Sequence, residues 1–239
     1  MHSNIYTKSF LPTFADFDRN MNFKPSSILN FLQEAASKHG EELNLGRQDL
    51  LKKGIFWVLT SIRYVVDQKI IYNEPITVST WPLVPSRIIC DRDYLIKGAF
   101  GGTIRASAEW CLLDVHTRRI VPSKVFDYGI DTYYRTESQI PKAEKLRTFA
   151  ANTMPPIEQI TVRFSDLDYN FHVNNAKYGD YVLNSLQNDA DIKEFYLQYV
   201  HECKLGDKID VYRKTIENAT YLDGKTQDGT TVFLAKIIC

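Results

Sequence analysis

A polar turn that occurs twice in the chain constrains the fold more than any other feature. Segment 15–23 reads ADFDRNMNF and segment 165–173 reads SDLDYNFHV, at a constant offset of 150 residues. The polar positions that coincide are Asp16 with Asp166, Asp18 with Asp168, and Asn20 with Asn170. Self-similarity at a fixed offset is typical of chains that fold as repeated units. We therefore expect two modules of the same kind.

An amphipathic segment follows each copy of the turn. After the first copy, Pro25-Ser26-Ser27 offers a helix start, and after the second copy Asn175 can cap a helix. Apolar residues then recur at helical spacing: Ile28, Phe31, Leu32, Ala35 and Ala36 in the first half, and Tyr178, Tyr181, Val182 and Leu186 in the second. The pattern therefore predicts one helix in each half.

Runs of residues typical of β-strands follow each predicted helix. They read FWVLTSIRYVV, ITVSTW, IICDRDYLIK and TIRASAEWCLLDV in the first half, and FYLQYVHEC, KIDVYRKTI, ATYL and TTVFLAKII in the second. Turn residues such as Asp223-Gly224 separate them. Because a single helix must cover each sheet, we predict an α+β fold in which each half is a long helix followed by an antiparallel meander.

The two halves are joined by an irregular segment. Segment 123–156 contains Pro141, Pro155, Pro156 and a charged run. We predict an N-terminal module at 1–130, a linker at 131–156 and a C-terminal module at 157–239.

The composition argues against several classes of partner. The chain has 239 residues and a net charge of zero, so bulk attraction to nucleic acid or to an anionic membrane is not expected. No apolar run approaches the ~20 residues that span a bilayer, and the first residues do not resemble a secretory signal. The four cysteines, Cys90, Cys111, Cys203 and Cys239, form no CxxC pair. We therefore expect a cytoplasmic protein with no metal and no organic cofactor.

The second copy of the turn carries chemistry that the first copy lacks. Asn22 of the first copy is replaced by His172 in the second. Histidine titrates near neutral pH, so it can act as an acid or a base. Asn170 and His172 immediately precede a helix N-terminus, whose N–H groups suit a developing oxyanion. The turn is therefore a candidate active site.

A second group of candidates lies at the end of the strand-like run FYLQYVHEC. It contains Glu202 and Cys203, and alignment of segment 206–209 with 73–76 places Lys69 and Ile70 at the corresponding positions of the first half. The first half thus lacks the histidine and both partners. We expect one site per chain, in the second half, with the first half shaping a pocket. The basic residues Arg118, Arg119 and Lys124 are expected to be solvated.

The alternation of residues along that run bears on the mechanism. The apolar parity of Phe195, Leu197 and Tyr199 continues to Cys203, which predicts that Cys203 faces the core and Glu202 the other side. A bulge at the strand end would allow both side chains to face the site.

These segments resemble the acyl-ACP thioesterases, plant and bacterial enzymes built as a double hotdog. The resemblance is carried by DLDYNFHVNNAKY and HEC in the second half, by NFLQEAASKHG, WVLTSIRYVVD and RASAEWCLLDVHTRRIVP in the first, and covers residue 5 to the end. It implies hydrolysis of the thioester of a fatty acyl chain on acyl carrier protein, with that carrier as partner. The catalytic residues it implies are Asp168, Asn170, His172, Glu202 and Cys203.

Several alternatives stay open at this stage. Either Cys203 is a nucleophile activated by His172, or Glu202 with His172 activates water, while Asp168 orients His172 or Asn170. We favour Glu202, since the whole set of residues is compatible with a water mechanism. The competing functions are an acyl-CoA thioesterase, a hotdog dehydratase and a non-catalytic acyl-binding or regulatory module. Acyl chain length is not specified, and both a monomer and a homodimer fit the tandem fold.

Overall fold

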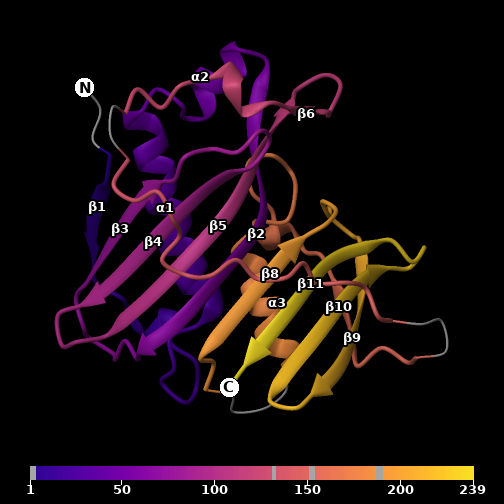
Figure 1. Ribbon diagram of the computed structural model, residues 1–239. Helices are drawn as coiled ribbons and strands as arrows, with labels where there is room; N and C mark the ends of the chain where they lie inside the picture. Colours follow the sequence, from indigo (N-terminus) through magenta and orange to yellow (C-terminus); the bar gives the residue numbers. More distant parts are fainter. Residues whose placement is uncertain (1–3, 131–132, 151–153, 187–190) are drawn as a thin grey trace.

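The computed structural model describes residues 4–130, 133–150, 154–186 and 191–239. Two long helices lie behind one large antiparallel sheet (Figure 1). The helices are α1 (Pro25–Glu42), α2 (Arg47–Lys52) and α3 (Lys177–Leu186). The strands are β1 (Tyr6–Phe10), β2 (Ile55–Gln68), β3 (Ile76–Pro82), β4 (Cys90–Gly98), β5 (Thr103–Asp114), β6 (Ile120–Val121), β7 (Glu158–Thr161), β8 (Glu194–Tyr199), β9 (Lys208–Ile216), β10 (Ala219–Thr226) and β11 (Thr231–Ile238). The predicted α+β class is confirmed.

The strand order shows that the two halves are built alike. It runs β1-β3-β4-β5-β2-β8-β11-β10-β9-β7, with β6 paired to β5, so the order within one half is the mirror image of the order within the other. β2 and β8 meet at the centre in antiparallel register, with Arg63 opposite Tyr196. The predicted simple meander is wrong for β2 and β8, because each pairs with the last long strand of its own half. This placement joins the two sheets and leaves no exposed edge between them.

The sheet and the helices enclose an apolar core. α1 buries Ile28, Leu29, Leu32 and Ala35, and α3 buries Tyr178, Tyr181, Val182 and Leu186, nearly all of them positions expected from the sequence. The two helices approach most closely at Gly179, where a Cβ atom would lie 2.5 Å from the backbone nitrogen of Ser26. Glycine is therefore required for this contact, which brings the first turns of α1 and α3 together.

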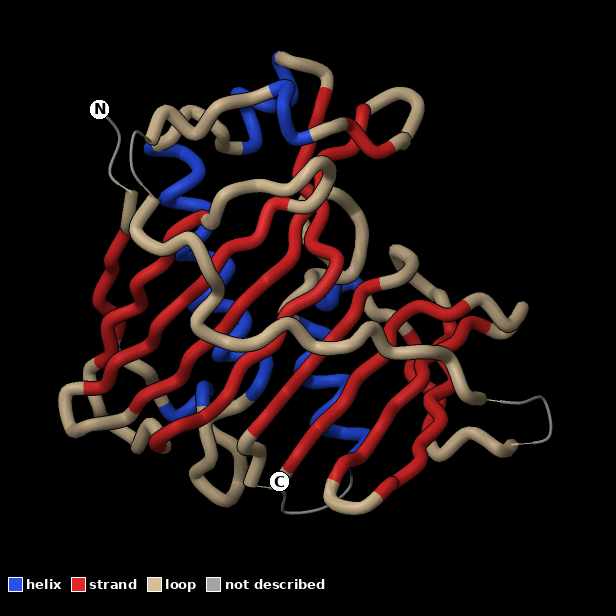
Figure 2. The backbone as a smooth tube through the Cα atoms, viewed as in Figure 1, coloured by secondary structure: helices blue, strands red, loops and turns tan. Residues whose placement is uncertain are grey.

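The segment between the halves crosses the face of the sheet opposite the helices (Figure 2). Arg105 and Arg63 donate to the carbonyls of Gln139 and Pro141, at 2.9 and 2.6 Å. Farther along, the hydroxyl of Thr148 and the amide of Phe149 donate to Asp223 Oδ2, at 2.6 and 2.9 Å. These contacts fasten the segment across both halves of the sheet.

The expected break at Asp223-Gly224 is wrong, because both residues lie inside β10. Asp223 is fully buried and is stabilised there by the donors of the crossing segment. At Gly224, a Cβ atom would lie 2.2 Å from the ring of Phe233. The residues that resemble a turn therefore serve contacts between distant parts of the chain.

Among the described residues, no helix is long and apolar enough to cross a membrane.

Candidate active site

The two copies of the polar turn adopt the same backbone conformation. Asp18 and Asp168 each accept the N–H of the asparagine two residues further on, at 2.8 Å in both copies. The residue three positions after each aspartate has a positive φ, 61° at Met21 and 64° at Phe171. The repeat predicted from the sequence is therefore a repeat of structure, and the two copies differ in their side-chain chemistry.

In the second copy, two aspartates hold the turn in place. Asp168 accepts the Asn170 carboxamide at 3.1 Å, which orients that amide as expected. Asp166 is buried and accepts the hydroxyl of Tyr181 at 2.9 Å and the amide of Arg163 at 2.8 Å. The hydrogen bond to Tyr181 ties the turn to α3. Asp166 thus has a structural role.

The helix after the turn begins differently from the expectation. The side chain of Asn174, rather than that of Asn175, accepts a backbone N–H, that of Ala176 at 2.9 Å. The carbonyl of Asn175 accepts the hydroxyl of Tyr199 at 3.0 Å, which links the start of α3 to β8. Asn175 is therefore held between the turn and the sheet.

The chain leaves the sheet before it reaches Glu202 and Cys203. β8 ends at Tyr199, so the strand expected to continue to Cys203 is four residues shorter. The amides of Val200 and His201 both donate to the carbonyl of Val232, at 2.8 and 3.1 Å, as in a bulge. The carbonyl of Cys203 then accepts the amide of Val173 at 2.9 Å. This bond brings the Glu202-Cys203 segment against the second copy of the turn.

Glu202 and His172 form the chemical centre of this arrangement. His172 Nε2 lies 3.3 Å from Glu202 Oε2, and both side chains are partly exposed, 22% and 44%. Solvent can therefore reach the pair. A carboxylate and an imidazole at this distance can hold a water molecule and take its proton.

Cys203 occupies a different environment from Glu202. It is completely buried, as the sequence parity predicted. Burial raises the pKa of its thiol to about 11, although a hydrogen bond with the neighbouring Tyr178 acts in the opposite direction. Thiolate is the nucleophilic form of cysteine, so this environment opposes a nucleophilic role.

A small apolar pocket lies at the start of α3, directly after the turn, and we refer to it as the catalytic pocket. Asn175 and Ala176 line it from the start of α3, together with Tyr199 of β8. The first half contributes Leu29 of α1 and Leu59, Ile62 and Trp110 of the sheet. The first half therefore shapes the pocket of the second half, as expected from its loss of polar residues.

Arg118 is a site residue that the sequence did not reveal. It lies in the turn between β5 and β6, and its Nη2 donates to Glu202 Oε2 at 2.7 Å, while its guanidinium stacks over Phe56 at 5.0 Å. Arg118, Arg119 and Lys124 are all exposed, as expected, but Arg118 also has this ion pair with Glu202. The contact joins residues 84 positions apart, so no local pattern indicates it.

Replacement of Arg118 by methionine is expected to lower kcat for the thioester hydrolysis predicted from the sequence by about threefold to tenfold. The reason is that Glu202 loses the charged hydrogen bond that orients its carboxylate toward His172, a contact worth ~0.7–1.4 kcal/mol in this half-exposed setting. Arg118→Lys should retain part of the activity, and Arg119→Met serves as the neighbouring control. Equal rates for Arg118→Met and Arg119→Met would show that Glu202 needs no such support.

No group of three or more histidine, cysteine or carboxylate side chains in the described ranges is placed to hold a metal ion.

The fold is that of a tandem hotdog protein, since one continuous sheet is built from two equivalent repeats, each with its own helix. The histidine–glutamate pair lies at one of the two matching turns, so the protein has one candidate active site. The sequence matches the acyl-ACP thioesterase N-terminal domain over residues 3–129 and the acyl-ACP thioesterase C-terminal domain over residues 150–235. The chain therefore belongs to the acyl-ACP thioesterase family, as its motifs indicated.

Solved structures confirm the tandem hotdog fold. An acyl-ACP thioesterase from Bacteroides thetaiotaomicron superimposes with a TM-score of 0.87 at 23% identity, covering 98% of this chain and 97% of that one. The 12:0-ACP thioesterase from Umbellularia californica superimposes with a TM-score of 0.85 at 20% identity, covering 100% and 98%.

The curated relatives are plant enzymes. The chloroplastic palmitoyl-acyl carrier protein thioesterase of Arabidopsis thaliana is 29% identical over 194 residues, which are 74% of this chain and 47% of that protein. The oleoyl-acyl carrier protein thioesterase 1 of the same plant is 24% identical over 253 residues, 94% of this chain and 68% of that protein. The chain spans about half the length of the first of these relatives.

Proposed function

We propose that the protein hydrolyses the thioester that joins a fatty acyl chain to acyl carrier protein and releases the free fatty acid. The observation that carries this proposal is the contact between His172 and Glu202 beside an apolar pocket. The same turn in the first half has neither residue. Family membership and the names of the relatives support the thioester substrate.

In the proposed mechanism, Glu202 is the general base and His172 assists it. A water bound beside this pair loses a proton to Glu202 and attacks the carbonyl carbon of the thioester. The carboxamide of Asn170 and the N-terminus of α3 stabilise the oxyanion. When the intermediate collapses, the carbon–sulfur bond breaks, and the proton passes to the leaving thiolate of the carrier. Asp168 positions Asn170 through the contact described above.

The surface around the turn suits a protein substrate. Phe164, Tyr169 and Phe171, which lie in the turn or directly before it, are exposed by 81%, 70% and 78%. Arg47 of α2 stacks over the ring of Tyr169 at 4.7 Å, and Arg118 lies nearby through its contact with Glu202. Acyl carrier protein is acidic, so an apolar surface flanked by two arginines provides complementary contacts. We propose that the carrier docks here.

The cytoplasmic location expected from the sequence stays a prediction.

Hydrolysis of acyl-ACP is expected to be faster than hydrolysis of the matching acyl-CoA, and only the former should depend on Arg47. Charge reversal in Arg47→Glu should raise KM for acyl-ACP by roughly threefold to tenfold at low salt, and less at high salt, because rim charges act on encounter with the partner. Free fatty acid released from a panel of both substrates measures this. Lys97→Glu is the control, since Lys97 lies near the end of β4 that is away from α2 (Figure 1).

Three other outcomes would contradict parts of the proposal. Equal or greater activity on acyl-CoA, insensitive to Arg47, would identify an acyl-CoA thioesterase. Equal effects of Arg47→Glu and Lys97→Glu would place the docking surface elsewhere. No cleavage of any thioester would make the non-catalytic acyl-binding module the leading function.

A further inference from the structure

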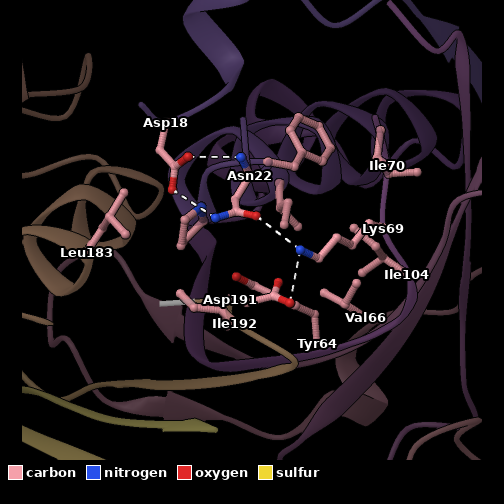
Figure 3. A pocket seen from close by; sticks show the side chains of 13 residues that line it. Asp18, Asn22, Tyr64, Val66, Lys69, Ile70, Ile104, Leu183, Asp191 and Ile192 are labelled. Carbon is pink, nitrogen blue, oxygen red and sulfur yellow. Dashed lines mark hydrogen bonds and ion pairs between the residues drawn. The ribbon is translucent and has the colours of Figure 1, made fainter. Parts of the chain in front are cut away.

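The matching turn of the first half borders a second pocket, larger than the catalytic pocket (Figure 3). We refer to it as the twin pocket. Its charged and amide lining residues are Asp18, Asn22, Lys69 and Asp191, and its other walls are mainly apolar, including Ile28, Val66 and Leu183. None of its lining residues belongs to the catalytic pocket.

The internal repeat relates the twin pocket to the catalytic pocket. Pro25 and Leu183 line the twin pocket, and the residues 150 positions away, Asn175 and Gln33, line the catalytic pocket. In the strands the offset is 133 residues, and it relates Val66 and Ile192 of the twin pocket to Tyr199 and Leu59 of the catalytic pocket. The two cavities are therefore equivalent places in the fold, and the twin pocket has kept its apolar walls.

The polar groups of the two pockets are also equivalent in position, but their charges are reversed. Asn22 Oδ1 lies 3.3 Å from Lys69 Nζ, where the second half has His172 beside Glu202. Lys69 in turn lies 2.9 Å from Asp191, which opposes it as Arg118 opposes Glu202. The chain of three groups is visible in Figure 3. A lysine and an amide cannot activate water at neutral pH, but a lysine can donate hydrogen bonds to an anion.

A buried hydroxyl gives independent evidence of a ligand. Tyr64 lines the twin pocket, is only 1% exposed, and its hydroxyl has no hydrogen-bond partner among the described residues. A buried polar group without a partner is costly, and such groups frequently mark a bound water or ligand. The twin pocket thus combines apolar walls, a hydroxyl without a partner among the described residues, and a partly exposed lysine.

We propose that the twin pocket is a non-catalytic binding site for a free fatty acid. The acyl chain lies among the apolar walls, and the carboxylate accepts hydrogen bonds from Lys69 in place of Asp191. Asp191 and Lys69 are both about half exposed, so their ion pair can open without leaving a buried charge. Binding at this site does not require hydrolysis, so the inference stands or falls independently of the proposed function.

The test is calorimetric titration of the whole protein with dodecanoate, below the concentration at which it forms micelles. We expect two sites per chain, one of which weakens by roughly tenfold to a hundredfold in Lys69→Met and recovers in Lys69→Arg, because a hydrogen bond to a charged group is lost and restored. Dodecanol has the same chain without the carboxylate, so its binding should not depend on Lys69.

Two tryptophan variants at repeat-related positions provide a matched pair. Leu183→Trp should fill the twin pocket, abolish the Lys69-dependent site and leave acyl-ACP hydrolysis unchanged. Gln33→Trp should fill the catalytic pocket, reduce hydrolysis and leave the Lys69-dependent site intact.

The proposal is wrong if wild-type protein has only one site, or if it has two sites and neither changes in affinity in Lys69→Met. Equal binding of dodecanol and dodecanoate at the Lys69-dependent site would overturn the carboxylate assignment. If a tryptophan variant fails to fold, the Lys69 variants still test the proposal, because the Lys69 side chain is at the surface.

Discussion

His172→Ala is expected to lower kcat for acyl-ACP hydrolysis by about 10²–10⁴-fold, because it removes an acid–base group that assists the proton transfer. The melting temperature should change little, since the ring is partly exposed and the turn is held by its aspartates. Rates of fatty acid release under saturating acyl-ACP measure the effect. A loss of less than about tenfold would remove His172 from the chemistry.

The repeat supplies a control that separates chemistry from turn structure. Asn170→Ala should lower kcat by about 10²–10³-fold, as expected for loss of an oxyanion donor. Asn20→Ala makes the same change in the first-half turn, where the aspartate contact is of the same length. It should leave the rate unchanged. If both variants lose activity equally, the asparagine matters for the fold of the protein rather than for the reaction.

The second large effect concerns the choice of base. Glu202→Gln is expected to lower kcat by about 10²–10⁴-fold, because glutamine keeps the shape of the side chain but cannot accept a proton from water. Cys203→Ala should stay within about tenfold of wild type, because Cys203 is buried and its raised pKa keeps it protonated. A small loss of stability is expected from the missing sulfur atom.

Chemical and pH measurements test the same choice without mutation. A thiol with a pKa of about 11 is protonated at neutral pH, so the rate should not rise with thiolate formation between pH 7 and about pH 9. Thiol-alkylating reagents should likewise leave the enzyme active. If Cys203→Ala is as inactive as His172→Ala while it remains folded, the nucleophilic mechanism is right and the water mechanism through Glu202 is wrong.

The fold could be predicted to a large extent because its signals are local. Helical spacing placed α1 and α3, and the run KIDVYRKTI coincides with β9, Lys208–Ile216. Where prediction was wrong, distant contacts decided the outcome. Asp223-Gly224 has the composition of a turn, yet the crossing segment stabilises it inside a strand. The run through Glu202 looks like a strand, yet the chain leaves the sheet to bond with the catalytic turn.

By itself, the sequence determined that the protein has two equivalent turns and that one of them carries a histidine. This information is local, because hydrogen bonds within nine residues build the turn and one substitution changes its chemistry. Only the tertiary structure decided which distant groups meet there. The strand order brings Arg118 of the first half to Glu202 of the second, and α1 to the pocket beside Asn175. Such pairs depend on the register between β2 and β8, which no short segment of the chain specifies.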